Sequence, residues 1–310
     1  MNQKIKSYQS VITGIGASLP KRVVTNKDLT KIVDTTEEWI VERTGIQERR
    51  IASDNETTSS LGTEAAKIAL QNAQLKSKDI DLIILATATP DNTFPASATV
   101  IQSSLGIEKC YAYDMQAVCS GFVFALEAAD NAIKAGNVKN ALVIGSETFS
   151  RILDWKDRGT CVLFGDGAGA VLVESGNSDQ GLLAYTLGAD GSGHDLLCIP
   201  MGGSADPVNA SGANQGQQFM RMEGRPVFKW AVRLIESTVR DVTREAGLDV
   251  SDIDLFILHQ ANSRIIDAAA ENLNVDRRKV IVNVDRYGNT SAGSIPLALD
   301  EAFREGKIQP

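Results

Sequence analysis

The sequence is poor in the residues and segments that several classes of protein require. Its 310 residues include only four cysteines and two histidines. The cysteines stand singly, with no Cys-x-x-Cys pair and no histidine at the spacing of a zinc site. No segment approaches the roughly 18 apolar residues of a membrane span, and residues 1–16 turn polar before a signal peptide could develop its apolar region. We therefore expect a cytoplasmic protein without a metal ion or a disulfide.

An excess of positive charge is also missing. The formal net charge is −8, which argues against broad electrostatic binding of nucleic acid. An acidic partner would have to meet a local basic patch. Hydrophobic residues make up 43% of the chain, enough to build the core of one large domain or of two fused ones.

An internal repeat organises the chain. The segment KDIDLIIL at 78–85 returns as SDIDLFIL at 251–258, so Asp252 follows Asp79 by 252 − 79 = 173 residues. Each copy follows a segment with helical periodicity, and each ends in an apolar run that is typical of a strand buried on both faces. The two helical segments are residues 60–73 and 227–246.

Other segments repeat at a similar spacing: residues 11–14 match 184–188, Tyr111–Met115 matches Val280–Val284, and Cys119 matches Asn289 at the start of a helix rich in small residues. Alternating strands and helices predict an α/β fold with mostly parallel sheets covered by helices. We expect two copies of one strand-and-helix unit, residues 1–175 and 176–310. Their strand ends would meet and carry Cys119, His259 and Asn289.

Cys119 is the candidate nucleophile. It stands in QAVCSGF, directly before a helix-forming run at 123–129, and the unpaired N–H groups of a helix start stabilise a thiolate. Cys110, Cys161 and Cys198 have no such setting. We interpret them as packing residues, which is also the alternative for Cys119.

His259 and Asn289 are the candidate hydrogen-bond donors. His259 directly follows the predicted strand 254–258, although a histidine that packs in the core is the alternative. His194, by contrast, lies in a glycine-rich loop. Asn289 could simply cap the helix that follows it, but its match to Cys119 in the repeat favours a role in the site. An amide and an imidazole N–H aimed at one point form an oxyanion hole for a thioester enolate.

The motifs AVCSGF at 117–122, HQAN at 259–262 and GNTSAGS at 288–294, in this order, resemble the Cys-His-Asn signature of the β-ketoacyl-acyl-carrier-protein synthase III family. The resemblance runs over nearly the whole chain and includes EEWIVERTGI at 37–46, DRGT at 157–160 and FGDGAGA at 164–170. It implies a thiolase-like fold, in which duplicated βα units form a layered αβαβα architecture.

The resemblance also implies an activity. The protein would be an acyltransferase that starts fatty-acid synthesis by condensing an acyl-CoA primer, with acetyl-CoA expected, and malonyl-acyl-carrier protein, with loss of carbon dioxide. Cys119 would carry the acyl group, while His259 and Asn289 would stabilise the enolate. No cofactor is expected, because the glycine-rich stretch 165–170 lies between two strand-like runs and not before a helix, unlike a dinucleotide loop.

By the same resemblance, coenzyme A and a second copy of the chain would meet particular residues. Trp39 and Arg158 resemble the family's adenine-stacking pair, with Arg43 nearby for phosphate, while core packing is the alternative for Trp39. Phe94 resembles the residue that reaches across a homodimer to shape the acyl pocket of the other subunit. The length and branching of the primer stay open.

A basic stripe is the candidate docking surface for the carrier protein. Arg225, Lys229 and Arg233 recur every fourth residue and so share one face of a predicted helix. Arg264 is a further candidate. An acidic carrier needs such a patch on an acidic enzyme, whereas a solvated helix face is the alternative.

Other functions fit parts of the pattern. A thiolase would need a second cysteine as base, and no cysteine follows Cys198. Chain-elongating synthases of the superfamily use two histidines, and Asn289 stands in the place of the second. A Cys-His-Asn condensing enzyme of secondary metabolism and a noncatalytic acyl-CoA-binding scaffold remain open alternatives.

The repeat also bears on the end of the chain. The helix after Cys119 ends near Gly136 and is followed by a strand-like run, whereas the matching helix ends near Gly306, just before the sequence stops. We therefore expect the native protein to extend by roughly 20 residues, two strands of ordinary length. The resemblance implies that these residues include a glycine-rich loop whose backbone N–H joins that of Cys119 in an oxyanion hole, so the 310-residue chain would be poorly active without it.

Overall fold

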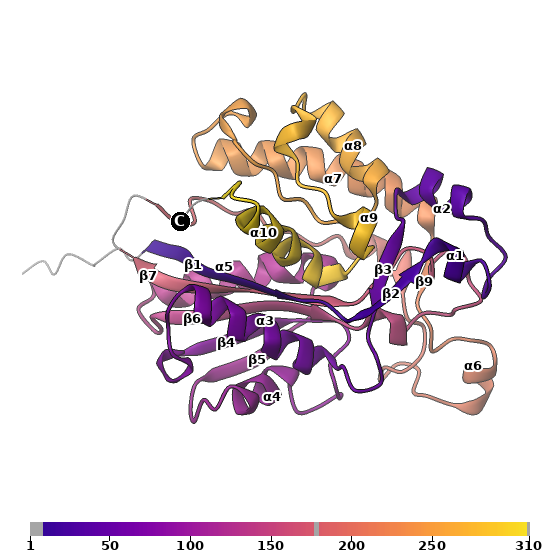
Figure 1. Cartoon of the computed structure of the whole chain (residues 1–310), viewed down its shortest axis with the longest axis horizontal. Helices are drawn as coiled ribbons and strands as arrows, with labels where there is room; N and C mark the ends of the chain where they lie inside the picture. Colours follow the sequence, from indigo (N-terminus) through magenta and orange to yellow (C-terminus); the bar gives the residue numbers. More distant parts are fainter. Residues whose placement is uncertain (1–8, 177–179, 309–310) are drawn as a thin grey trace, which may run out of the picture.

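The structure, a computed structural model, describes residues 9–176 and 180–308 (Figure 1). Its centre is a mixed sheet in the strand order β1–β7–β6–β4–β5. The strands are β1 (Gln9–Ser18), β4 (Leu82–Ala86), β5 (Tyr111–Met115), β6 (Asn140–Glu147) and β7 (Gly167–Gly176). β4 is parallel to β5 and β6, while β7 is antiparallel to β1 and β6. The three parallel strands therefore end at the same edge of the sheet.

β4 forms the middle of the core. All of its residues are buried, as the apolar run predicted, because helices cover both faces of the sheet. Figure 1 shows α3 and α4 on one side of the sheet and α5 and α10 on the other. These helices are α3 (Thr58–Asn72), α4 (Ser97–Ser104), α5 (Gly121–Lys134) and α10 (Ser294–Arg304). Full burial of each Leu or Ile side chain contributes about 2 kcal/mol.

Helix α3 confirms the periodicity of residues 60–73. Thr57 caps its start, since the hydroxyl accepts the N–H of Ser60 at 3.1 Å while the Ser60 hydroxyl accepts the N–H of Thr57 at 2.8 Å. Leu61 and Ala65 then fall on the face that packs against the sheet. Local capping and apolar spacing together place this helix.

The remaining elements lie mostly outside the sheet: β2 (Arg22–Thr25), α1 (Asn26–Leu29), α2 (Glu37–Thr44), β3 (Glu48–Ile51), β8 (Leu197–Cys198), α6 (Ala210–Asn214), β9 (Arg221–Met222), α7 (Gly224–Glu245), α8 (Ser263–Asn272) and α9 (Val284–Tyr287). Helix α7 confirms the periodicity of 227–246. In Figure 1, α7 and α8 lie side by side above α10.

The strands predicted for the second half are largely wrong. Residues 184–188 form no strand, and residues 254–258 and 280–284 meet in a single parallel bridge between Phe256 and Val280. Val284 begins a helix instead of ending a strand. The physical reason is the number of neighbours: β4 is hydrogen-bonded on both sides, whereas the described residues offer 254–258 a partner on one side only.

The two halves meet at a pair of tight turns, η2 (Val118–Ser120) and η7 (Ser291–Gly293). Each turn begins with a residue of positive φ, 46° at Val118 and 49° at Ser291, and each is followed at once by a helix. The spacing is 291 − 118 = 173 residues, the offset of the repeat. Cys119 therefore matches Ala292, and the predicted match to Asn289 is three residues out of register.

A close backbone approach fixes η7 against the sheet. A Cβ added to Gly145 in β6 would lie 2.1 Å from the carbonyl oxygen of Ala292, so only glycine fits. Within the residues that the structure describes, no helix combines the length and apolar character needed to cross a membrane.

Candidate active site

Cys119 lies where β5 leads into α5. It occupies the middle of η2, directly before the helix start at Gly121, close to where the sequence predicted it. The positive φ of Val118 costs a β-branched residue about 1–3 kcal/mol. Backbone strain of this kind is concentrated at functional sites, and here it belongs to the neighbour of the candidate nucleophile.

The surroundings of the thiol keep it protonated. Desolvation raises the pKa of Cys119 to about 11; a hydrogen bond with the Ser291 side chain lowers this pKa, and the charge of Glu147 raises it further. The thiolate expected from the helix start is therefore not the resting form, because the loss of hydration outweighs the stabilising contacts.

Glu147 is a buried carboxyl near Cys119. It is the last residue of β6, and its Oε2 accepts the hydroxyls of Thr87 at 3.0 Å and Thr89 at 2.6 Å. Its Oε1 accepts the hydroxyl of Ser291 at 2.9 Å. Burial raises the pKa of Glu147 to about 7, although the hydrogen bonds act in the opposite direction. Glu147 thus fastens η7 to the ends of β4 and β6.

Asn289 is buried and held by its backbone and its side chain. Its N–H donates to the carbonyl of Leu163 at 2.8 Å, and its carbonyl accepts the N–H of Gly165 at 3.0 Å. The side-chain Oδ1 accepts the N–H of Ser291 at 2.9 Å, so Asn289 does cap the turn that follows it. With Oδ1 occupied in this way, the amide nitrogen is the group that can donate to a ligand.

His259 follows the Phe256 bridge and is partly buried. Its Nδ1 lies 2.5 Å from the hydroxyl oxygen of Ser294, and burial lowers the pKa of His259 to about 4. The imidazole is therefore neutral near pH 7 and able to donate one hydrogen bond.

Gln260 holds the chain in place beside His259. Its Nε2 donates to the carbonyls of Leu258 and Ile281, and its Oε1 accepts the N–H of Asn283 at 3.0 Å. The segment Asn289–Ser294 connects the three candidate catalytic residues, since it includes Asn289, bonds Cys119 through Ser291 and bonds His259 through Ser294. The structure therefore brings these three predicted residues to one place.

A cavity of about 500 Å³ shares one neighbour with this segment, Leu163, although none of the described residues 289–294 lines it. Five basic residues line it: Arg43, Arg158, Arg225, Lys229 and Arg264. None of the described residues that line it is Asp or Glu. Its wall includes Leu163, whose carbonyl binds Asn289, and Asn262, whose side chain donates to the carbonyl of Arg43 at 3.1 Å. Such a cavity is suited to a ligand that carries phosphate groups.

Trp39 belongs to the same cavity. The guanidinium carbons of Arg158 and Arg43 lie 5.1 Å and 5.5 Å from its ring centroid. An aromatic face bounded by two guanidinium groups can accept a flat base by stacking. Trp39 is also packed against the cluster around Ile40, so the core-packing alternative accounts for part of its contacts.

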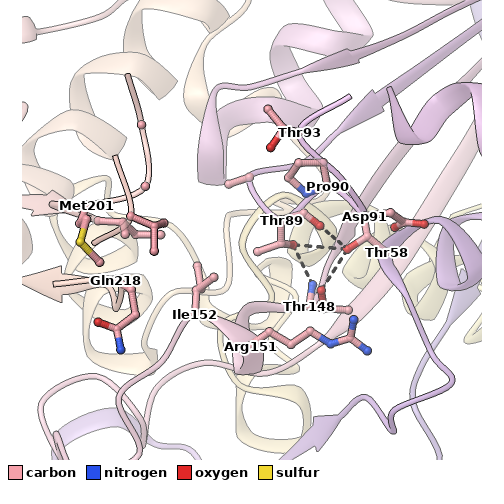
Figure 2. Close-up of a pocket in the computed structure, with 15 residues that line it drawn as sticks. Thr58, Thr89, Pro90, Asp91, Thr93, Thr148, Arg151, Ile152, Met201 and Gln218 are labelled. Atoms are coloured by element: carbon pink, nitrogen blue, oxygen red, sulfur yellow. Dashed lines mark hydrogen bonds between the residues drawn. The ribbon is translucent and has the colours of Figure 1, made fainter. Parts of the chain in front are cut away.

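Two of the predicted site residues lie neither at the basic cavity nor beside the candidate catalytic residues. Arg233 lies on α7 with Arg225 and Lys229 but does not line the cavity. Phe94 is 83% exposed. Its neighbour Thr93 lines a second cavity of about 560 Å³, where the hydroxyls of Thr58, Thr89 and Thr148 form a network (Figure 2).

Sequence patterns assigned no role to four residues that shape the site, Glu147, Ser291, Ser294 and Gln260. Their roles depend on contacts between segments that are distant in the sequence, and this information is absent from local patterns. One signal was available for Glu147, because it ends a strand parallel to β4 and such strand ends carry functional groups. For Ser294, the signal was its place 173 residues after Gly121 in the repeat.

Comparison with known proteins identifies close relatives. Family models described as 3-oxoacyl-[acyl-carrier-protein (ACP)] synthase III, and as its C-terminal part, match residues 113–191 and 243–310. The β-ketoacyl-[acyl-carrier-protein] synthase III of Brucella anthropi is 54% identical over 97% of this chain and 92% of its own length. That of Agrobacterium fabrum is 53% identical with the same coverage.

Solved structures agree with these matches. The crystal structure of 3-oxoacyl-[acyl-carrier-protein] synthase III from Aquifex aeolicus superposes with a TM-score of 0.89 at 49% identity, covering 97% of this chain and 92% of that one. The corresponding protein of Pseudomonas aeruginosa gives a TM-score of 0.89 at 38% identity, with coverage of 97% and 91%.

Proposed function

The chain belongs to the β-ketoacyl-acyl-carrier-protein synthase III family, and from this membership we propose that it condenses an acyl-CoA primer with malonyl-acyl-carrier protein to start fatty-acid synthesis. The fold is the thiolase fold of these enzymes. The observation that carries the proposal is the meeting of Cys119, His259 and Asn289 around the segment Asn289–Ser294. The high identity to synthase III relatives favours this function over a role in secondary metabolism.

In the first half-reaction, the sulfur of Cys119 attacks the thioester carbon of the primer. A new thioester forms on Cys119 and the bond to coenzyme A breaks. Because desolvation keeps Cys119 protonated, its proton leaves as the sulfur attacks, and the departing sulfur of coenzyme A takes up a proton to become a free thiol. Desolvation of the sulfur favours this thioester, which carries no charge, over a free thiolate.

In the second half-reaction, malonyl-acyl-carrier protein loses carbon dioxide and leaves an enolate. The amide of Asn289 and the neutral imidazole of His259 donate hydrogen bonds to its oxygen, each worth about 3 kcal/mol in the transition state. The enolate carbon then attacks the acyl group on Cys119, the bond from that acyl group to the sulfur breaks, and the sulfur takes up a proton to regenerate the thiol. Neither donor requires a charge change, which suits a buried site.

The basic cavity supports both substrates. Coenzyme A and the prosthetic arm of the carrier both carry phosphate, and the cations of Arg43, Arg158 and Arg225 can bind it. Stacking of adenine on Trp39 follows from the two guanidinium groups beside it. Lys229 and Arg264 lie at the same opening and are suited to the acidic surface of the carrier.

The proposal includes a cytoplasmic homodimer. Phe94, a large apolar residue, is 83% exposed, and the family resemblance implies that it reaches across to the acyl pocket of a second copy. The size of the primer stays open, because it depends on how that residue closes the acyl pocket.

Acylation followed by intact mass tests the function. Incubation with an acyl-CoA should add one acyl group to the wild type and none to Cys119→Ala. Acylation of Cys110 or Cys161 in that variant would contradict the assignment, and so would a wild type that binds acyl-CoA without becoming acylated. His259→Ala and Asn289→Ala should still acylate but fail to condense.

A further inference from the structure

The hydroxyl of Ser294 lies between two groups of the His259 loop. Its oxygen is 2.5 Å from Nδ1 of His259 and 3.3 Å from the backbone nitrogen of Gln260. Ser294 is the first residue of α10 and is 1% exposed. Its single proton therefore has to be satisfied inside the protein.

The hydrogen-bond count fixes the direction of the contact to the imidazole. The N–H of Gln260 can only donate, so the Ser294 oxygen accepts from it. Among the described residues, Nδ1 of His259 is the one acceptor that the structure places at the Ser294 hydroxyl. If Nδ1 carried the proton, the buried hydroxyl would accept twice and its own hydrogen would be left without a partner, at a cost of about 1–3 kcal/mol.

The repeat gives an independent reason to regard the contact as specific. The residues that match His259 and Ser294 at an offset of 173 are Ala86 and Gly121 (259 − 86 and 294 − 121). A Cβ on Gly121 would lie 3.1 Å from the Cβ of Ala86. The equivalent segments thus meet in both halves, and only the second half has a hydroxyl and an imidazole there.

We propose that Ser294 is a positioning residue that donates its hydroxyl proton to Nδ1 and so holds His259 as the Nε2–H tautomer. The inference rests on the proposed function for the ligand of Nε2, the enolate oxygen. With Nδ1 accepting and Nε2 protonated, His259 is a fixed donor. It follows that His259 does not take the proton of Cys119 during acylation, because neither ring nitrogen has a lone pair to offer.

Nuclear magnetic resonance tests the tautomer directly. The chain has two histidines, and His194 lies exposed in a loop, so His194→Gln leaves one imidazole to observe. In protein labelled with ¹⁵N-histidine near neutral pH, we expect an Nε2 that carries a proton and an Nδ1 that does not. A protonated Nδ1 would overturn the proposal.

Variants of Ser294 connect the tautomer to the reaction. Ser294→Ala should give a mixture of tautomers and slow condensation about tenfold or more, while acylation of Cys119 stays within about twofold. Ser294→Thr, which keeps the hydroxyl, should restore both the spectrum and the rate. Ser237→Ala, an exposed serine on α7, is the matched control. A pure Nε2–H tautomer in folded Ser294→Ala would refute the proposal that Ser294 selects this tautomer.

The two measurements separate failure of this inference from failure of the proposed function. The spectrum needs no substrate, so it reports on Ser294 even if the substrates are different. Condensing activity with an Nδ1–H imidazole would refute the positioning role alone. An Nε2–H imidazole in a protein that never condenses would support the positioning role and refute the function.

Discussion

Cys119 and Glu147 form an electrostatic pair at the scale of single residues. Ionised Glu147 raises the pKa of Cys119, after desolvation has already raised it. With a pKa of about 11, roughly one Cys119 in a thousand is a thiolate at pH 8. The charge on Glu147 thus contributes to keeping the Cys119 thiol protonated.

Removal of that charge should activate the thiol. We expect Glu147→Gln, which keeps the shape of the side chain, to lower the pKa of Cys119 and speed its alkylation by iodoacetamide near pH 8 by about threefold to tenfold. Intact mass follows the reaction, and Glu64→Gln on the exposed face of α3 is the control. An alkylation rate equal to that of the wild type would mean that the charge of Glu147 does not affect the pKa of Cys119.

His259 makes stability depend on pH. Burial lowers its pKa from 6.5 to about 4, so between these values the unfolded chain binds a proton that the folded chain does not. The free energy of unfolding therefore falls as the pH falls through this window. The full effect of such a shift is about 3 kcal/mol, and because His259 is only partly buried we expect about 2 kcal/mol.

Denaturant unfolding of the wild type and His259→Asn at several pH values measures this contribution. The stability difference between them should change by about 2 kcal/mol between pH 7 and pH 4. Glu147, whose pKa is raised to about 7 by burial, has the opposite dependence, but both proteins keep it. Parallel curves for the wild type and His259→Asn would refute the assigned pKa.

At the scale of elements, the site depends on how closely η7 approaches β6. Gly145→Ala would place a Cβ 2.1 Å from the carbonyl oxygen of Ala292. We expect the unfolding free energy to fall by about 1–3 kcal/mol. Acylation and condensation should both slow, because η7 carries Ser291 and joins Asn289 to Ser294.

The control is Gly188→Ala, where an added Cβ meets nothing within 4 Å. Chemical denaturation and both half-reactions, assayed under conditions where each variant is folded, measure the effect. If Gly145→Ala behaved like Gly188→Ala, the close contact between η7 and the sheet would not be what positions the site.

The elements themselves differ in how far the sequence could predict them. Helix α3 and strand β4 follow from short-range signals, a capping pair and an apolar run. The turns η2 and η7 do not, because Val118 and Ser291 are not residues that favour a positive φ. Without those two angles, the match between Cys119 and Ala292 could not be predicted, although the strand-end positions of Cys119, His259 and Asn289 did indicate that these residues would meet.

At the scale of the whole molecule, the repeat could be recognised in the sequence, but the secondary structure of its second copy could not be predicted from it. A strand needs hydrogen-bonded neighbours, which depend on distant segments, so the repeated DIDL motif could predict β4 and yet fail for residues 254–258. The division into residues 1–175 and 176–310 stays a prediction. Helix α10 of the second half packs with β1 and β7 of the first, so the two halves share one core.

The net charge of the whole molecule and the charge of its basic cavity have opposite signs. The chain carries a net charge of −8, which repels an acidic carrier at long range. By our proposal, the five basic residues of the cavity attract it at short range. Salt screens both effects, with a Debye length of about 10 Å at 0.1 M.

The balance between these effects predicts how Lys229→Glu responds to salt. In the wild type, added salt should raise the apparent KM for malonyl-acyl-carrier protein, because close attraction within the cavity dominates docking. In Lys229→Glu, we expect a KM for the carrier about tenfold higher at low salt. This KM should fall as salt is added, because salt then screens mainly the repulsion between the acidic enzyme and the acidic carrier. Arg233→Glu, outside the cavity on the same helix, should keep the direction of the wild-type response. An equal rise in KM for acyl-CoA and for the carrier would assign Lys229 to the coenzyme site alone, whereas a larger rise for the carrier supports docking at this opening.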